Sequence, residues 1–125
     1  MVIYQIEFPP VFGPRAAARM NSLKAAGDRV AVGDLSRMEC RVQPVNAADR
    51  PLLARFDAYF ARPDIIVLPL SAAVCERAAS IRARHRSRTP DALHLAAAII
   101  GGCDLFLTND AHLAACTDIG VEVLA

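Results

Sequence analysis

The sequence is poor in aromatic residues and contains no long apolar run, and each shortage excludes a class of structure. Aromatic residues make up 6% of the 125 residues, and tryptophan is absent, whereas 54% of the residues are hydrophobic. The core must therefore be built mainly from alanine and aliphatic side chains. No run of about 18 apolar residues occurs, so we expect no membrane-spanning helix. The opening segment has neither a basic region nor a cleavage site, so we expect no signal peptide and a soluble, cytoplasmic protein.

The chain also lacks an excess of charge of one sign. Lys and Arg number 14 against 13 Asp and Glu, which leaves a net charge of +1. This balance does not predict a nucleic-acid partner, so any such surface must be local. The four cysteines form neither a CxxC pair nor a zinc-binding spacing, and we expect them to be buried thiols. A length of 125 residues predicts a single domain, residues 1–125.

Strand-like and helix-like segments alternate between glycine and proline breakers. Strands are expected at 29–33, 64–69, 105–107 and 120–124. Helices are expected at 15–26, after a cap at Asp34 or Ser36, at about 47–61, after a cap at Ser71 as far as His85, at about 90–100, and briefly from Asp110. The third of these helices should bury its large apolar residues, Leu52, Leu53, Phe56, Tyr59 and Phe60. This alternation predicts an α/β fold, with a parallel sheet between helices.

Three acidic residues fall near the ends of predicted strands, where α/β sheets bind ligands. Glu39 lies early in the helix after strand 29–33, Asp91 opens a helix, and Asp110 follows strand 105–107. Converging carboxylates suit a hard divalent cation such as Mg²⁺ or Mn²⁺. Each residue also has a structural interpretation, because Asp91 and Asp110 are typical of helix N-termini and Glu39 of a solvated helix. The residues alone leave both interpretations open.

Three segments resemble motifs of PIN domains, and of VapC toxins in particular. Thr89–Ala96 is similar to the third acidic motif of PIN domains, and Asp104–Asp110 with Leu113 is similar to the fourth. Gly33–Arg41 is similar to the segment that carries the second acid of VapC toxins. The similarity extends over nearly the whole chain. It implies a three-layer PIN-like fold with a parallel central sheet flanked by helices.

The resemblance implies a function as well as a fold. Glu39, Asp91 and Asp110 would be the metal ligands and catalytic residues, with Thr108 and Asn109 lining the pocket. The activity implied is that of an endoribonuclease toxin of a type II toxin–antitoxin system, which uses Mg²⁺ or Mn²⁺ to hydrolyse phosphodiester bonds in tRNA, rRNA or mRNA. A small VapB-like antitoxin would neutralise the toxin, and the chain would form a homodimer.

The sequence departs from the PIN pattern at its start, where the family has a strand that ends in an aspartate. No aspartate precedes Asp28. In one interpretation, residues 2–6 are that strand and the aspartate has been replaced. In the other, which we favour, residues 3–7 match the following helix, and the first strand is missing from a truncated chain. Glu7 is a poor substitute ligand in either case. The alternative function is therefore an impaired PIN remnant that binds antitoxin or RNA without cleaving it.

Two further features each have a functional and a structural interpretation. Arg84, Arg86 and Arg88 belong to a basic cluster at a helix end, which predicts either RNA phosphate contacts or a solvated helix terminus. His94 lies one helical turn after Asp91, and it either hydrogen-bonds within the pocket or packs in the core.

Overall fold

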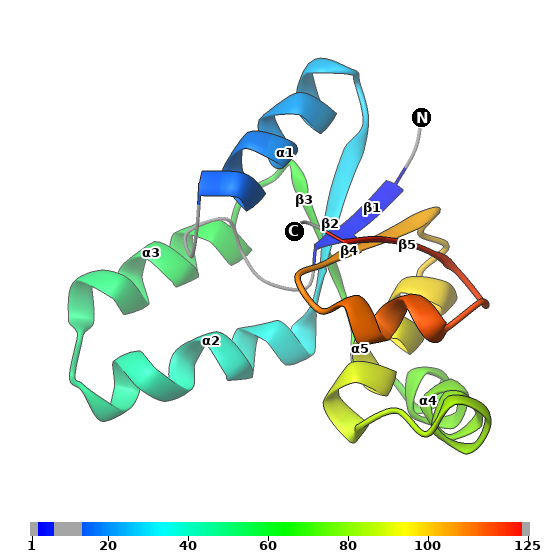
Figure 1. Cartoon of the computed structure of the whole chain (residues 1–125). Coiled ribbons are helices and arrows are strands. Elements are labelled where there is room, and N and C mark those ends of the chain that lie inside the picture. Colours follow the sequence, from blue (N-terminus) through cyan, green and yellow to red (C-terminus); the bar gives the residue numbers. More distant parts are fainter. Residues whose placement is uncertain (1–2, 7–13, 124–125) are drawn as a thin grey trace.

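The predicted alternation of strands and helices forms a five-stranded parallel sheet with helices on both faces (Figure 1). The computed structural model describes residues 3–6 and 14–123. Its strands are β1 (Ile3–Ile6), β2 (Arg29–Gly33), β3 (Ile65–Leu68), β4 (Leu105–Thr108) and β5 (Gly120–Val123). Its helices are α1 (Pro14–Ala25), α2 (Asp34–Asn46), α3 (Arg50–Phe60), α4 (Ala72–His85), α5 (Thr89–Ile100) and the 3₁₀ helix η2 (Ala111–Ala115). The α/β class predicted from the sequence is confirmed.

Strand β1 lies in the middle of the sheet, whose order is β3-β2-β1-β4-β5. Tyr4 pairs in parallel with Val30 of β2 on one side and with Leu105 of β4 on the other. The expectation that the first strand is missing is therefore wrong. The β-branched and aromatic residues at the start favour an extended strand, and two neighbouring ladders hold it there. Glu7 and residues 8–13 lie outside the described part of the chain.

The two faces of the sheet bury separate cores because successive strand residues point in opposite directions. On one face, Ala31 and Phe106 pack against α4 and α5, which contribute Ile81 and Leu95 among others. The opposite face packs against α1 and α3, and its buried residues are Met20, Leu23, Val30, Val32, Tyr59, Phe60, Ile65 and Leu107. The result is three layers, as the resemblance implies. The predicted buried residues Leu52 and Leu53 are only partly buried.

Local capping decides where the helices begin. The side chain of Ser71 accepts a hydrogen bond from the Val74 backbone N–H, so the predicted cap of α4 is confirmed. The predicted cap of α2 at Asp34 or Ser36 is wrong. Gly33 holds that position, without a side-chain hydrogen bond, because the last residue of β2 leads directly into the helix. Asp49 caps α3 by accepting from the Leu52 N–H, so this helix starts later than predicted.

The cysteines differ in their surroundings more than expected. Cys40 and Cys116 are buried, but Cys75 is exposed and Cys103 is partly exposed, and all four are free thiols. Burial raises the pKa of Cys40 to about 12 and that of Cys103 to about 11, so both thiols are neutral at physiological pH. Over the described residues, every helix is too short or too polar to cross a bilayer.

Candidate acidic metal centre

The three predicted acidic residues sit on elements near the carboxyl edge of the sheet. Glu39 belongs to α2, which follows β2 directly. Asp110 follows β4 and is the N-cap of η2. Asp91 lies in the first turn of α5, and it lines one hollow together with Asp110. Because parallel strands end at one edge, the topology collects side chains from segments far apart in the sequence.

Asp91 and Asp110 share a single cation, the guanidinium of Arg88. Arg88 Nε donates to Asp91 Oδ2 at 3.0 Å, and a terminal nitrogen of Arg88 lies 3.8 Å from Asp110 Oδ2. The Asp91 side chain is 11% exposed, whereas that of Arg88 is 77% exposed. The buried carboxylate of Asp91, at the N-terminus of α5, is thus neutralised from the solvent side by the long, exposed side chain of Arg88. The two aspartates face the same positive charge.

Asp110 is held in its orientation by its own turn. Its Oδ1 accepts hydrogen bonds from the His112 backbone N–H at 2.9 Å and lies 3.0 Å from His112 Nδ1. The backbone bond, followed by the side-chain bond, lowers the pKa of Asp110 below its ordinary value. The buried Thr108 accepts from the Asp110 N–H at 3.0 Å, and Asn109 between them is exposed. Thr108 therefore supports the turn of Asp110, but neither Thr108 nor Asn109 lines the hollow that Asp91 and Asp110 share.

Glu39 is held by the predicted pocket histidine. His94 Nε2 lies 2.5 Å from Glu39 Oε1, and this contact joins α2 to α5. The His94 side chain is 1% exposed and that of Glu39 is 27% exposed. His94 is thus packed in the core and contacts Glu39, but neither residue lines the hollow that holds Asp91 and Asp110.

The three carboxylates are not one compact ligand set. Within residues 3–6 and 14–123, the one group of three His, Cys, Asp or Glu residues with ligand atoms all within 4.8 Å of one another is elsewhere. Asp91 and Asp110 fit a divalent cation, because they already turn toward one shared positive charge. Glu39 would have to exchange or share its contact with His94. The residues present thus fit a metal ion best at the aspartate pair.

The predicted basic cluster is divided among three tasks. Arg88 bridges the two aspartates, and Arg84 forms an ion pair with Asp118. Arg86 caps α4 in the left-handed conformation, at φ 54°, and lines the same hollow of about 610 Å³ as Asp91 and Asp110. The cluster is therefore not simply a solvated helix end. The contact of Arg88 with Asp91 has a local signal in the sequence, because three residues separate them, the (i, i+3) spacing of a helical ion pair. The contact with Asp110 has no such signal, because it joins distant segments.

The comparisons with known proteins agree with this architecture. Residues 3–118 match the model of the PIN domain family, and no curated protein matches the chain. The fold is similar to a chain of the VapBC2 complex from Rickettsia felis bound to a DNA fragment from its promoter, with a TM-score of 0.78, 15% identity and 98% of both chains covered. It is also similar to a chain of a toxin–antitoxin complex from Klebsiella pneumoniae, with a TM-score of 0.68, 20% identity and 100% of this chain and 98% of that chain covered. At these low identities, the two solved structures show likeness of fold alone. The family itself is shown by the PIN match, which covers most of the chain. The protein belongs to the PIN domain family, as its resemblance to VapC toxins implied.

Proposed function

We propose that this protein is a metal-dependent endoribonuclease toxin that acts on RNA in the cytoplasm and is neutralised by a VapB-like antitoxin. The observation that carries the proposal is the buried Asp91, which faces Asp110 across one shared cation at the carboxyl edge of the sheet. PIN-family membership supports a nuclease. The toxin–antitoxin complexes with the same fold support the biological role.

Asp91 and Asp110 would hold Mg²⁺ or Mn²⁺, with Glu39 as the third carboxylate and Thr108 supporting the turn of Asp110. When bound, the ion would polarise a phosphoryl oxygen and lower the pKa of a coordinated water. Burial of Asp91 strengthens its electrostatic interaction with a cation, because little solvent screens it. These residues therefore provide the negative charge that a hard cation requires.

His94 and Arg88 would orient the carboxylates or balance their charge, and Arg88 would contact RNA as well. The contact of His94 with Glu39 fixes one carboxylate oxygen, which restricts the orientation of the other. Arg88 keeps the two aspartates from repelling each other while no cation is bound. Arg86 and Arg88 line the same hollow and would contact phosphates of a bound RNA. Arg84 is a weaker candidate for such a contact because Asp118 already pairs with it.

The test is cleavage of total RNA by the purified, folded chain with Mg²⁺ or Mn²⁺. We expect cleavage products with a 5′-phosphate and a 3′-hydroxyl, and we expect EDTA to abolish the reaction. Asp91→Asn and Asp110→Asn should each lower the rate at least about a hundredfold, since each removes a charged ligand. Asp57→Asn on α3 is the matched control, because this 63% exposed carboxylate lies outside the site. Equal cleavage by Asp91→Asn and the control would contradict the assignment.

The alternative is a PIN remnant that binds antitoxin or RNA without cleavage. The contact of Glu39 with His94 and the lack of an aspartate before Asp28 favour it. A ligand set that is short of one carboxylate binds metal less tightly and positions it less well. RNA binding that survives in a folded chain, together with no cleavage in either metal, would identify this alternative.

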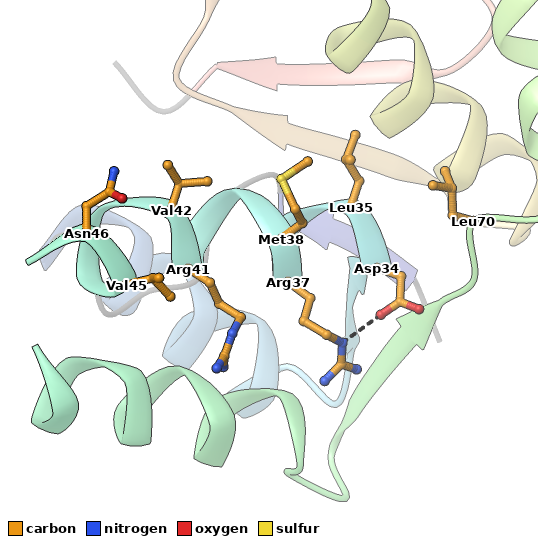
Figure 2. A pocket seen from close by; sticks show the side chains of 9 residues that line it. All are labelled: Asp34, Leu35, Arg37, Met38, Arg41, Val42, Val45, Asn46 and Leu70. Atoms are coloured by element: carbon orange, nitrogen blue, oxygen red, sulfur yellow. Dashed lines mark hydrogen bonds and ion pairs between the residues drawn. The ribbon is translucent and has the colours of Figure 1, made fainter. Parts of the chain in front are cut away.

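For the antitoxin, we propose a docking surface centred on α2, which we call the apolar α2 face. Leu35, Met38, Val42 and Val45 of α2 form it together with Leu70, which follows β3. Met38, Val42 and Val45 are each more than half exposed, and Leu70 nearly so. Figure 2 shows Leu35, Met38 and Val42 projecting to one side of α2, at the spacing of a helical stripe. Arg37 and Arg41 project away from that side. Arg37 pairs with Asp34, and Arg41 pairs with Asp57.

An apolar stripe of this spacing suits an amphipathic antitoxin helix. Val42→Asp should weaken the binding of a VapB-like antitoxin at least about tenfold, because it places a charge in the apolar contact. Ala54→Asp on α3 is the exposed control. If the two variants bind antitoxin equally well, the antitoxin lies elsewhere. The mass of the free chain in solution tests the homodimer that the resemblance implies, and loss of the dimer in Val42→Asp would assign this face to a second copy instead.

A further inference from the structure

A second cluster of possible metal ligands lies outside the acidic centre. His85 ends α4, Cys116 follows η2, and Asp118 lies in the turn before β5. Each of the three offers one ligand atom, and these atoms all lie within 4.8 Å of one another. Two segments thus bring an imidazole, a thiol and a carboxylate to one point: the end of α4 and the connection between η2 and β5, although 33 positions separate His85 from Asp118.

The ligand groups of this cluster are largely shielded from solvent, which favours a bound ion. Cys116 is 4% exposed, and the Asp118 side chain is 10% exposed. His85 Nε2 is buried, and it has no hydrogen-bond partner among the described residues. A buried polar atom without a partner costs free energy, on the order of 1–3 kcal/mol. A bond from a metal ion to the imidazole would remove that cost.

The charges around the cluster select the type of ion. Arg77 lies 3.3 Å from Asp118 Oδ2, and Arg84 contacts the same oxygen. Two guanidinium groups repel a weakly bound hard cation, and a thiol and an imidazole are poor ligands for Mg²⁺ or Ca²⁺. A borderline-soft ion bound through a thiolate overcomes this repulsion, because the thiolate adds a negative charge and a strong bond. Both arginines contact Oδ2 of Asp118, which leaves Oδ1 for the ion.

We propose that His85, Cys116 and Asp118 form a zinc site that is distinct from the acidic centre. Zn²⁺ accepts each of the three donors, an imidazole nitrogen, a thiolate sulfur and a carboxylate oxygen, and three protein ligands leave a fourth position for water. Tetrahedral zinc separates its ligand atoms by roughly 3 to 4 Å, so side-chain adjustments suffice to close the cluster. Binding forms a zinc–sulfur bond and releases the Cys116 proton to solvent, with no change of oxidation state.

The position of the site gives it a structural consequence. His85 and Cys116 line the same hollow as Asp91 and Asp110. An ion held between α4 and the segment after η2 would restrain the loop that carries Arg86 and Arg88, and also the helix that Asp110 caps. The zinc site therefore links the segment after η2 to the loop between α4 and α5, and it uses none of the carboxylates of the acidic centre.

Cobalt(II) is the probe, because a thiolate bound to Co²⁺ produces a near-ultraviolet charge-transfer band and four-coordinate Co²⁺ absorbs in the visible. The reduced, metal-free full chain is titrated with Co²⁺ in excess Mg²⁺, which occupies the acidic centre. We expect one equivalent of Co²⁺ to produce both bands and Zn²⁺ to displace it. Cys116→Ser should abolish the thiolate band. Asp118→Asn should keep it with affinity lowered at least about tenfold.

Cys75→Ser is the matched control, because this exposed cysteine lies on α4 away from the cluster. Should Cys116→Ser fail to fold, alkylation of the native chain gives an independent answer. Zn²⁺ should then protect Cys116 from alkylation and leave Cys75 reactive, as read by mass spectrometry. The proposal is overturned if no thiolate band forms, if Cys75→Ser removes the band, or if Zn²⁺ leaves the alkylation of Cys116 unchanged. A stoichiometry of one ion per two chains would also overturn it.

Discussion

Arg88 occupies the position that a metal ion would compete for. Its guanidinium contacts Asp91 at 3.0 Å and approaches Asp110 to 3.8 Å, but its side chain remains 77% exposed. Such an exposed ion pair contributes about 0–1 kcal/mol, since water screens it and the long side chain loses entropy. A divalent cation between the same carboxylates has twice the charge. The arginine therefore neutralises the aspartates without preventing exchange for a metal.

Replacing Arg88 tests this competition. Arg88→Ala should tighten the binding of Mn²⁺ by a factor of about 2 to 5, the equivalent of removing a contact worth roughly 1 kcal/mol or less. The same change should weaken RNA binding if RNA is the substrate, because the phosphate contact proposed for Arg88 would be lost. Calorimetric titration measures the first effect and filter binding the second. Arg55→Ala, at an exposed position of α3, is the control. Weaker Mn²⁺ binding by Arg88→Ala would mean that the arginine organises the site instead.

The depressed pKa of Asp110 makes its cap a pH-dependent feature. Because the folded pKa lies below the ordinary value of 3.8, the ionised cap stabilises the fold above the unfolded pKa, and this stabilisation is lost as the pH falls through the folded pKa. His112→Ala should raise the pKa of Asp110 only partway, since the backbone N–H of residue 112 still donates. Carboxyl-carbon NMR measures both pKa values, with Asp57 as the internal control. A full return to 3.8 would assign the whole effect to the imidazole.

At the scale of the elements, short-range chemistry accounts for most helix starts. Ser71 and Asp49 both precede a helix and accept from the third N–H that follows. Ser71 was predicted as a cap because local sequence suffices to recognise this pattern. The start of α2 was mispredicted, because β2 continues into the helix through Gly33 and leaves no position for a side-chain cap. The direct connection depends on the sheet, which local sequence does not specify.

The cap of α4 has a measurable energetic contribution. Ser71→Ala should lower the free energy of unfolding by about 1 kcal/mol, because the Val74 N–H loses its acceptor. Ser80→Ala, at an exposed position within the same helix, should be neutral or slightly stabilising, since alanine favours the helical interior. Urea unfolding of both variants measures the difference. Equal stabilities would show that the cap is not needed where α4 packs against α5.

At the scale of the whole molecule, β1 joins the two halves of the sheet. It pairs with β2 and β4, so it links strands whose positions in the sequence are more than 70 residues apart. The bidentate ion pair between Arg19 of α1 and Glu122 of β5, at 2.8 and 2.9 Å, adds a second link between the start and the end of the chain. The fold therefore depends on a four-residue strand.

A proline in β1 tests that dependence. Gln5 pairs with Ala31 and Phe106, so Gln5→Pro removes an N–H from a strand with neighbours on both sides. We expect a loss of about 3 kcal/mol or more in the free energy of unfolding, a large share of the roughly 5–15 kcal/mol typical of a domain. Gln5→Ala keeps the N–H and serves as the control. Urea unfolding that is the same for both variants would show that β1 is dispensable.

The sequence by itself determined the α/β alternation and the resemblance to the family, and it singled out Asp91 and Asp110 as candidate ligands. Hydrophobic periodicity, breakers and short motifs are local properties, so a sequence contains them without its fold. Tertiary structure decided what no local pattern contains. It placed residues 3–6 at the centre of the sheet, turned Glu39 toward His94, set Arg88 between Asp91 and Asp110, and gathered His85, Cys116 and Asp118. Each of these depends on contacts between segments distant in the sequence, and such contacts form only when the parallel ladders and the two buried cores bring those segments together.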